Sequence, residues 1–245
     1  KGCDLLLAQS KAFIPPLNEY ANRSKIRYQP NSFPEQSTDE PIDAPADLLD
    51  LLDKKFCVVF AGNLGQAQAL DCVVDAAELL KDHNDISIVL VGSGSRSEWL
   101  AEQKRSRGLH NLELPGRFPM QTMASIFGRA GALLVSLEDD PIFALTIPSK
   151  IQAYLAAGKP VLASLNGEGA RVVLEAGAGL ASSAGDSAGL SANILKVQAM
   201  SAKQREAMGQ HARAYFLEHF ETDSQATHLA ETLSAMGAGN SLGAI

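Results

Sequence analysis

Cysteine, histidine and long apolar runs are scarce in this chain of 245 residues, and each shortage argues against a class of protein. The three cysteines, Cys3, Cys57 and Cys72, are odd in number and include no Cys-x-x-Cys pair, so neither a disulfide framework nor a zinc site is indicated. The five histidines are scattered without the spacing of metal ligands. No apolar run reaches the roughly 18 residues that cross a membrane. We therefore expect no bound metal and a reducing, cytoplasmic compartment.

Basic residues are also too few for a typical nucleic-acid-binding protein. Lys and Arg number 21 against 28 Asp and Glu, so the formal charge is −7. A chain of this charge lacks the basic footprint that contacts phosphate backbones, and we expect no nucleic-acid partner. Hydrophobic residues make up 46% and charged residues 20%, which is the balance of an ordinary globular protein and not of a disordered one.

The sequence begins without Met, and Lys1-Gly2 leads directly into the apolar segment 3–8. This start lacks the basic leader, long apolar centre and cleavage site of a signal peptide. Segment 3–8 is typical of an internal strand, so we expect the chain to be a fragment of a longer protein.

Short apolar runs alternate with helical patterns along most of the chain. Continuous apolar strands separated by helices are typical of a parallel sheet that is covered on both faces. The predicted fold class is therefore α/β, a doubly wound, Rossmann-like parallel sheet. The expected strands are 56–61, 86–91, 111–114, 132–136, 160–164 and 179–182. The expected helices are 47–53, 70–81, 97–107, 120–130, 149–157, 170–176, 188–200, 202–218 and 223–236.

Such sheets bind ligands at the carboxyl ends of their strands, so candidate site residues should follow the apolar runs. Gly62, Asn63 and Gly65 follow the first strand, where glycines let the backbone approach a ligand. The spacing is not Gly-x-Gly-x-x-Gly, and no acidic residue ends the second strand, so a nicotinamide cofactor is not indicated. The alternative is a tight strand-to-helix turn without a ligand.

Two further turns carry cations. Gly92, Gly94 and Arg96 follow the second strand, where the alternative role is a helix start capped by a nearby serine. Arg117 and Phe118 follow the third strand, where an aromatic ring beside a glycine and a proline can frame a flat base. That segment can equally be a loop that leads into the next helix.

The segment Pro148-Ser149-Lys150 is the most informative part of the sequence. Pro148 precedes a helix, Ser149 can cap it, and Lys150 lies in the first turn. A lysine there opposes the helix dipole, and an anionic ligand shared by the lysine and the helix explains its position. A solvated lysine is the alternative.

Glu168 opens a later helix after Gly167. Its carboxylate suits either the free N–H groups of that first turn or the hydroxyls of a ribose or sugar. The two readings are equally open. Asp139 and Asp140 follow the fourth strand but are more typical of a solvated loop than of a metal site.

Together these segments resemble the nucleotide-sugar half of the retaining glycosyltransferases of family 4, which have the GT-B fold. The Pro-Ser-Lys and Gly-Asn-x-Gly forms are most similar to bacterial enzymes that build O-antigen or capsule. The resemblance covers nearly the whole chain and is carried by segments 60–65, 91–94, 114–117, 147–150, 156–161 and 175–180.

The resemblance implies three regions. Residues 1–36 correspond to a remnant of the N-terminal acceptor domain and the start of a linker. The polar stretch 35–45 has the composition of that linker. Residues 37–222 correspond to the nucleotide-sugar donor-binding domain, the C-terminal half of the GT-B fold. Residues 223–245 correspond to a C-terminal helix and tail. We expect residues 1–34 to pack poorly or to rearrange, because their own sheet is absent.

The implied activity is transfer of a sugar from a nucleotide donor, UDP-linked in this reading, to a glycan or lipid-linked acceptor of surface polysaccharide, O-antigen or lipopolysaccharide synthesis. The resemblance implies no metal and no cofactor beyond the nucleotide-sugar substrate. It also leaves room for a peripheral membrane contact through the missing N-terminal domain at the inner face of the membrane. The donor-binding residues that it implies are Gly62, Asn63, Gly65, Gly92, Gly94, Arg96, Arg117, Phe118, Pro148, Ser149, Lys150 and Glu168.

The chain departs from the family at two places. Many members carry two glutamates eight positions apart, and the matching positions here are Leu145 and Ala153. Many also hold the diphosphate with an Arg and a Lys after the first strand, where this chain has Asn63 and Gln68. No catalytic residue is therefore assigned. The alternatives are a non-catalytic nucleotide-sugar-binding subunit and a GT-B sugar-nucleotide epimerase, and we expect the isolated fragment to be inactive.

Overall fold

The computed structural model describes residues 2–34 and 40–237. The expected boundary between residues 36 and 37, the first part of the expected linker and the last residues of the expected tail lie outside the described residues.

Six parallel strands form one sheet in the order β5-β4-β3-β6-β7-β8. From β3 the chain winds outward through β4 to β5, and it then returns to the other side of β3 at β6. This reversal next to β3 creates the crevice in which doubly wound sheets bind ligands. The predicted fold class is confirmed. The strands are β3 (Phe56–Asn63), β4 (Ile86–Ser93), β5 (Leu112–Gly116), β6 (Ala132–Ser136), β7 (Val161–Ser164) and β8 (Gly179–Ser182).

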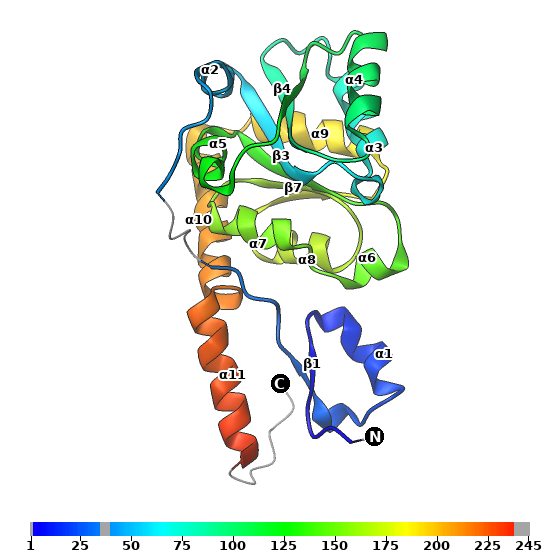
Figure 1. Cartoon of the computed structure of the whole chain (residues 1–245), viewed down its shortest axis with the longest axis vertical. Helices are drawn as coiled ribbons and strands as arrows, with labels where there is room; N and C mark the ends of the chain where they lie inside the picture. Colours follow the sequence, from blue (N-terminus) through cyan, green and yellow to red (C-terminus); the bar gives the residue numbers. More distant parts are fainter. Residues whose placement is uncertain (1, 35–39, 238–245) are drawn as a thin grey trace.

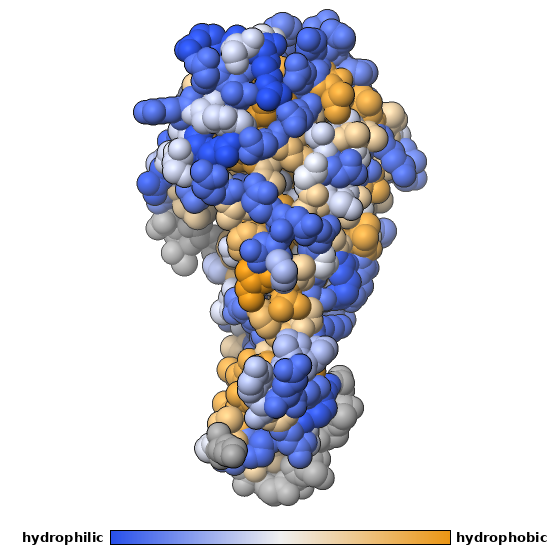
Figure 2. Space-filling model, turned by 90° about the vertical axis from the view of Figure 1, so that its right-hand side faces the viewer, coloured by the Kyte–Doolittle hydropathy of each residue, from blue (hydrophilic) through white to orange (hydrophobic). Residues whose placement is uncertain are grey.

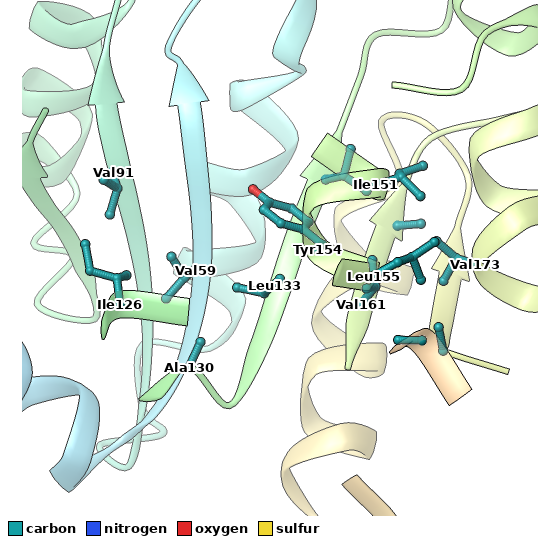
Figure 3. Close-up of a cluster of buried hydrophobic side chains, with 14 of the residues drawn as sticks. Val59, Val91, Ile126, Ala130, Leu133, Ile151, Tyr154, Leu155, Val161 and Val173 are labelled. Atoms are coloured by element: carbon teal, nitrogen blue, oxygen red, sulfur yellow. The ribbon is translucent and has the colours of Figure 1, made fainter. Parts of the chain in front are cut away.

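Helices cover both faces of this sheet (Figure 1). Side chains alternate across β3, so that Val59 packs on one face while Val58 and Phe60 pack on the other. Figure 3 shows the cluster around Val59, to which Tyr154 belongs. One face carries α3 (Leu70–Leu79), α4 (Ser97–Ser106) and α9 (Ser187–Gln198), and the other carries α2 (Ala46–Lys54), α5 (Met123–Arg129), α7 (Ser149–Ala156), α8 (Glu168–Glu175) and α10 (Ala202–His219).

Two local predictions are corrected. The expected helix 120–130 begins as a single 3-10 turn, η4 (Met120–Thr122), and only then continues as α5. A short helix, α6 (Pro141–Leu145), follows Asp139 and Asp140, where no helix was expected. Asp140 caps α6 by accepting a hydrogen bond from the Ile142 N–H at 2.8 Å, and Pro141 occupies its first position. Another 3-10 turn, η3 (Gln66–Gln68), follows β3.

The N-terminal residues form a small unit of their own, drawn in blue below the large sheet in Figure 1. Its two parallel strands are β1 (Leu6–Ala8) and β2 (Ile26–Tyr28), joined through η1 (Lys11–Phe13), α1 (Ile14–Asn18) and η2 (Arg23–Lys25). α1 is short: Pro15 and Pro16 lie in its first turn, and it ends at Asn18.

This unit is ordered against the large domain at several points. Ser10 is fully buried, and its hydroxyl donates to the carbonyl oxygen of Leu145. The buried Gln152 side chain donates to the carbonyl oxygen of Asn31. The expectation of poor packing is therefore wrong at this boundary, although Leu7 and Tyr20 remain 44% and 84% exposed. Figure 2 shows apolar surface both on the narrow lower part and on the wider domain above it.

The chain ends in α11 (Thr222–Gly237), which continues from α10 and extends beside the N-terminal unit (Figure 1). The backbone N–H of Phe33 donates to the carbonyl oxygen of Phe220 at 2.8 Å, which ties the N-terminal segment to the α10–α11 junction. Within the described ranges, we find no helix with the length and apolar character needed to cross a bilayer.

Candidate functional site

A cavity of about 880 Å³ opens at the carboxyl ends of β3 and β4, at the switch point of the sheet. This volume suits a ligand of the size of a nucleotide or a drug. Its walls come from β3, β4, the β5–α5 segment, α7 and the N-terminal segment. The lining residues are Phe33, Ala61, Gly62, Asn63, Val91, Gly92, Ser93, Arg117, Phe118, Pro119, Met120, Met123, Phe127, Ser149, Lys150, Ala153 and Tyr154.

Two glycines shape the floor of the cavity. Gly62 and Gly92 are paired across β3 and β4, with φ of +144° and +145°. A methyl group on Gly92 would lie 1.8 Å from the carbonyl oxygen of Gly62, so no other residue fits without moving the strand. At Gly62 a methyl group would lie 2.6 Å from Cε of Lys150. Glycine at this position therefore leaves room for the lysine stem.

The next glycines brace the turns behind the cavity and do not line it. A methyl group on Gly94 would lie 2.4 Å from the carbonyl oxygen of Leu64, and one on Gly65 would lie 2.6 Å from Nδ2 of Asn63. The Leu64 N–H donates to the Ser93 carbonyl oxygen at 2.9 Å, which joins the two turns directly. Gly65 and Gly94 thus fix the turn that presents Asn63.

Lys150 occupies the centre of the site. It is the second residue of α7, whose N-cap is Pro148, and Ser149 is the first helical residue. The prediction that Ser149 caps the helix is wrong, because the N-cap position is one residue earlier. Ser149 is exposed and lines the cavity instead.

The Lys150 ammonium group has a neutral side-chain partner. It donates to Oε1 of Gln68, and its Nζ lies 4.6 Å from the centroid of the Phe60 ring. Burial lowers the pKa of Lys150 to about 8. Gln68 is itself held in place, because its carbonyl oxygen accepts a hydrogen bond from the Ser136 hydroxyl at 2.7 Å. The cation is therefore positioned, partly desolvated and, among the described residues, without a carboxylate partner.

Tyr154 anchors α7 to β3. The backbone N–H of Ala61 donates to the Tyr154 hydroxyl oxygen at 2.9 Å, and the ring packs edge-on to Phe127 with centroids 5.4 Å apart. Figure 3 shows the Tyr154 ring reaching from α7 into the core. Sequence reasoning missed this residue. The signal was its spacing of four from Lys150, which places both side chains on one side of the helix.

The wall formed by the β5–α5 segment is largely apolar and carries the predicted Arg117 and Phe118. Phe118 is half-buried and lines the cavity together with Met123 and Phe127, and the Arg117 side chain is exposed. Phe33, from the N-terminal segment, also lines the cavity and was not predicted. Among the lining residues in the described part of the chain there is no Asp or Glu, so the cavity favours an anion.

The two charged residues among the predicted ones that lie outside the cavity lining, Arg96 and Glu168, are each held by an ion pair. Arg96 donates to Asp71 at 2.8 and 2.9 Å, and its guanidinium lies 3.6 Å from the centroid of Trp99. Glu168 is 7% exposed and accepts a hydrogen bond at 2.8 Å from Arg171, three residues later on α8.

Glu168 also accepts a hydrogen bond from the backbone N–H of Lys11 at 3.2 Å. Its carboxylate therefore joins α8 to the N-terminal unit.

The structure thus brings together seven of the twelve predicted residues. The lining includes Gly62, Asn63, Gly92, Arg117, Phe118, Ser149 and Lys150 and omits Gly65, Gly94, Arg96, Pro148 and Glu168. Of the two positions that we expected to match the family 4 glutamates, Ala153 lines the cavity and Leu145 does not. In the described ranges, no three His, Cys, Asp or Glu side chains gather as metal ligands.

A doubly wound sheet with a cavity at its switch point is the arrangement in which nucleotide-binding proteins of this fold hold their ligands. The family described as glycosyl transferases group 1 matches residues 49–215, which include most of the large sheet and its cavity. The chain belongs to this family of glycosyltransferases.

Relatives are found among curated proteins and solved structures. The chain is 30% identical over 153 residues to a protein of Escherichia coli K12 named as the colanic acid biosynthesis glycosyl transferase WcaI, and 28% identical over 122 residues to one of Pseudomonas aeruginosa named as the glycosyltransferase WbjE. These matches cover 62% and 49% of this chain and 34% and 30% of the relatives, so the chain spans about a third of their length.

HepE of Anabaena in complex with UDP superposes with a TM-score of 0.77 at 18% identity, covering 95% of this chain and 64% of HepE. The HepE complex with UDP-glucose gives a TM-score of 0.74 at 19% identity, with the same coverage. These structural neighbours are GT-B glycosyltransferases, and they establish the fold of this chain.

Proposed function

We propose that the cavity binds the nucleotide diphosphate of a UDP-linked sugar, with Lys150 contacting the diphosphate. The observation that carries the proposal is a positioned lysine in the first turn of α7 whose side-chain hydrogen-bond partner is the neutral Gln68. The helix dipole disfavours a cation at this position unless an anion is bound there. The complexes of HepE with UDP and UDP-glucose support UDP as the nucleotide.

The rest of the cavity suits the nucleoside. Phe118, with Met123 and Phe127 beside it, offers a flat apolar wall for a base, and Arg117 at the rim adds a second cation. Asn63, Ser93 and Ser149 supply the polar side chains for sugar hydroxyls or phosphate oxygens. The carboxylates of Glu168 and Asp71 are engaged by Arg171 and Arg96 and have no part in this arrangement.

In the proposed reaction the bond between the sugar's anomeric carbon and the diphosphate oxygen breaks, the acceptor hydroxyl oxygen forms the new bond with retention of configuration, and the hydroxyl proton passes to the released diphosphate. Negative charge then develops on the leaving diphosphate. Lys150 and the N–H groups at the start of α7 are placed to stabilise that charge, without a metal ion or another cofactor. The acceptor is a glycan or a lipid-linked glycan of surface polysaccharide, a proposal supported by the name of the WcaI relative.

In our proposal, sugar transfer requires parts of a longer protein in addition to this chain. The chain spans about a third of its curated relatives, and we expect it to bind the donor without transferring sugar, because the acceptor is not positioned. We place the longer protein in the cytoplasm, at the inner face of the membrane where a lipid-linked acceptor is available.

One observation favours a second candidate function, a non-catalytic nucleotide-sugar-binding subunit. Leu145 and Ala153 occupy the positions where family 4 members carry glutamates, and Ala153 faces the cavity. Assays of the longer protein with a panel of nucleotide sugars and acceptors distinguish the two candidates. Transfer supports the enzyme, and donor binding without transfer supports the subunit.

Calorimetry tests the binding proposal. UDP should bind the chain with an affinity on the order of 0.1–1 mM, and more tightly than GDP or ADP. Lys150→Ala should weaken UDP binding by about 1–3 kcal/mol, the range for a hydrogen bond to a charged group, and should change uridine binding much less. Lys81→Ala, an exposed lysine outside the cavity, is the matched control. Equal losses for UDP and uridine would contradict the assignment.

A further inference from the structure

A second hollow, of about 780 Å³, lies at the opposite edge of the sheet, beneath the amino ends of β3, β6 and β7. Its outer wall is α10. Five cationic residues line it, and Glu206 is the one acidic residue among the described lining residues. In a chain with a formal charge of −7 this concentration of positive charge is local and does not reflect composition. The cations are Lys55, Arg129, Lys159, Arg205 and Arg213.

The three arginines have structural partners. Arg205 donates to the carbonyl oxygens of residues 197, 198 and 200 at the end of α9, and Arg213 donates to the Ala156 carbonyl oxygen at the end of α7. Arg129 lies 3.4 Å from Asp53. Because helices in this fold end at the amino edge of the sheet, their carbonyl groups and dipoles favour cations there. Helix capping therefore accounts for Arg205 and Arg213.

Helix capping does not account for the two lysines. The ammonium groups of Lys55 and Lys159 have no hydrogen-bond or ion-pair partner among the described residues. Both side chains are only partly exposed, and burial lowers the pKa of Lys159. A partly desolvated cation without a counter-ion is costly, and an anion in the hollow would remove that cost.

The elements around the hollow are closely packed. Gly209 of α10 packs directly on the turn between α7 and β7, since a methyl group there would lie 2.1 Å from the carbonyl oxygen of Gly158. Arg205 lies 5.5 Å from the centroid of the Phe56 ring, which forms part of the same wall. The cations are thus presented by elements that pack on one another around the hollow.

We propose that this hollow binds a phosphate-bearing anion through Lys55 and Lys159, at a site separate from the donor cavity. The arginines that line the hollow add a positive field, because a cleft lined by charge of one sign concentrates counter-ions. The ligand chemistry is one or two phosphate groups, supplied either by a small phosphate in solution or by an anionic lipid headgroup. Lys150 cannot serve this ligand, because it lines the cavity at the other edge of the sheet.

The test is made in the Lys150→Ala background, so that diphosphate binding in the donor cavity is weakened and the outcome does not depend on the proposed function. Inorganic pyrophosphate is titrated calorimetrically in one arm. Vesicles of phosphatidylglycerol, with phosphatidylcholine vesicles as the reference, are co-sedimented with the protein in the other. Binding in the first arm identifies a soluble phosphate, and binding to the anionic vesicles alone identifies a lipid headgroup.

Lys55→Met and Lys159→Met keep the apolar stems and remove the charges. In whichever arm shows binding, each substitution should lower the affinity by about tenfold, as expected for loss of a hydrogen bond to a charged group. Lys81→Met should leave that affinity unchanged. Circular dichroism and thermal unfolding check the fold. If Lys159→Met does not fold, Lys55→Met alone must show the loss. Binding in neither arm, or binding that survives the substitutions, would overturn the proposal.

Discussion

At the carboxyl edge of the sheet, Lys150 lies in a cavity with an apolar wall and no carboxylate among its described lining residues, whereas at the amino edge five cations surround a hollow that also holds Glu206. The helices explain the contrast. The helices that connect the strands, such as α7, begin at the carboxyl edge, where their N-termini favour anions, and end at the amino edge, where their C-termini favour cations.

A basic side chain therefore has a different explanation at each of the two edges. Arg205 and Arg213 donate to carbonyl oxygens at the C-terminal ends of helices, so the helix dipoles explain their positions without a ligand. Lys150 opposes the dipole of α7, so its position points to a bound anion. Positive charge by itself does not identify a ligand site, and its relation to the local helix ends does.

The largest expected effect is on the stability of the carboxyl edge. Gly92→Val should destabilise the fold by about 3 kcal/mol, from the strain of a side chain at positive φ together with overpacking. The cause is steric, because a Cβ atom added at Gly92 would lie only 1.8 Å from the carbonyl oxygen of Gly62. Urea unfolding measures the change. Gly108→Val is the control, because its φ is +63° but its surroundings are open. Equal losses for the two variants would show that the close approach is unimportant.

The next effect is a pH dependence of donor binding. The pKa of Lys150 is lowered to about 8 from its ordinary value of 10.5, so the lysine loses its proton as the pH rises through 8. A bound diphosphate favours the charged form and raises this pKa. UDP binding should therefore take up a proton near pH 9 and almost none near pH 7. Affinity should fall by up to about tenfold per pH unit above 8.

Calorimetry in buffers of different ionisation enthalpy measures this proton uptake, and Lys150→Arg should abolish it. Uptake that persists in the arginine variant would assign the titration to another group.

The same shift has a consequence for stability. Because the pKa of Lys150 is lower in the folded state, the unfolded chain binds more protons between pH 8 and 10.5. The cost of the buried charge is fully present below pH 8 and is relieved as the pH rises through this window. Lys150→Met should therefore be more stable than the natural chain at pH 7, and this advantage should shrink by pH 10. Urea titrations at the two pH values measure it, and an advantage that grows with pH would contradict the burial.

A smaller effect is expected at Tyr154. Tyr154→Phe leaves the Ala61 N–H without the acceptor that now lies at 2.9 Å, and it should cost roughly 1 kcal/mol of stability. Donor affinity should also fall, because the hydroxyl holds α7 against β3 beside Lys150. Tyr20→Phe, at an 84% exposed position, is the matched control. A loss in the control equal to that in Tyr154→Phe would indicate that the buried hydrogen bond contributes nothing.

The smallest effect tests the wall of the cavity. Phe118→Ala should weaken UDP and uridine binding equally, by about 1 kcal/mol, the lower end of the range for base stacking. This pattern differs from that expected for Lys150→Ala, which should weaken UDP binding much more than uridine binding. If UDP binding weakened and uridine binding did not, the base would not be in contact with Phe118.

The sequence predicted the sheet well because apolar runs such as 86–91 are long enough to be strands that are buried on both faces. It failed where structure depends on short-range geometry. The 3-10 turn Met120–Thr122 and the helix Pro141–Leu145 are too short to show a hydrophobic period.

The site was predicted in part for a similar reason. Gly62 and Lys150 lie next to strands or helix starts that meet at one edge, so their convergence follows from topology. Arg96 and Glu168 also lie near strand ends, but Asp71 and Arg171 engage them. The Glu168–Arg171 spacing of three was visible in the sequence. Phe33 reaches the cavity from a distant segment, which no local pattern reveals.

Lysine footprinting tests the central claim, that the donor diphosphate binds at Lys150. Limiting acetic anhydride at pH 8 acetylates each exposed amine, and mass spectrometry reports the extent at every lysine with and without UDP. The account predicts that UDP protects Lys150 with the concentration dependence seen by calorimetry, and that Lys81 reacts equally in both cases. Unchanged acetylation of Lys150 at saturating UDP would contradict it.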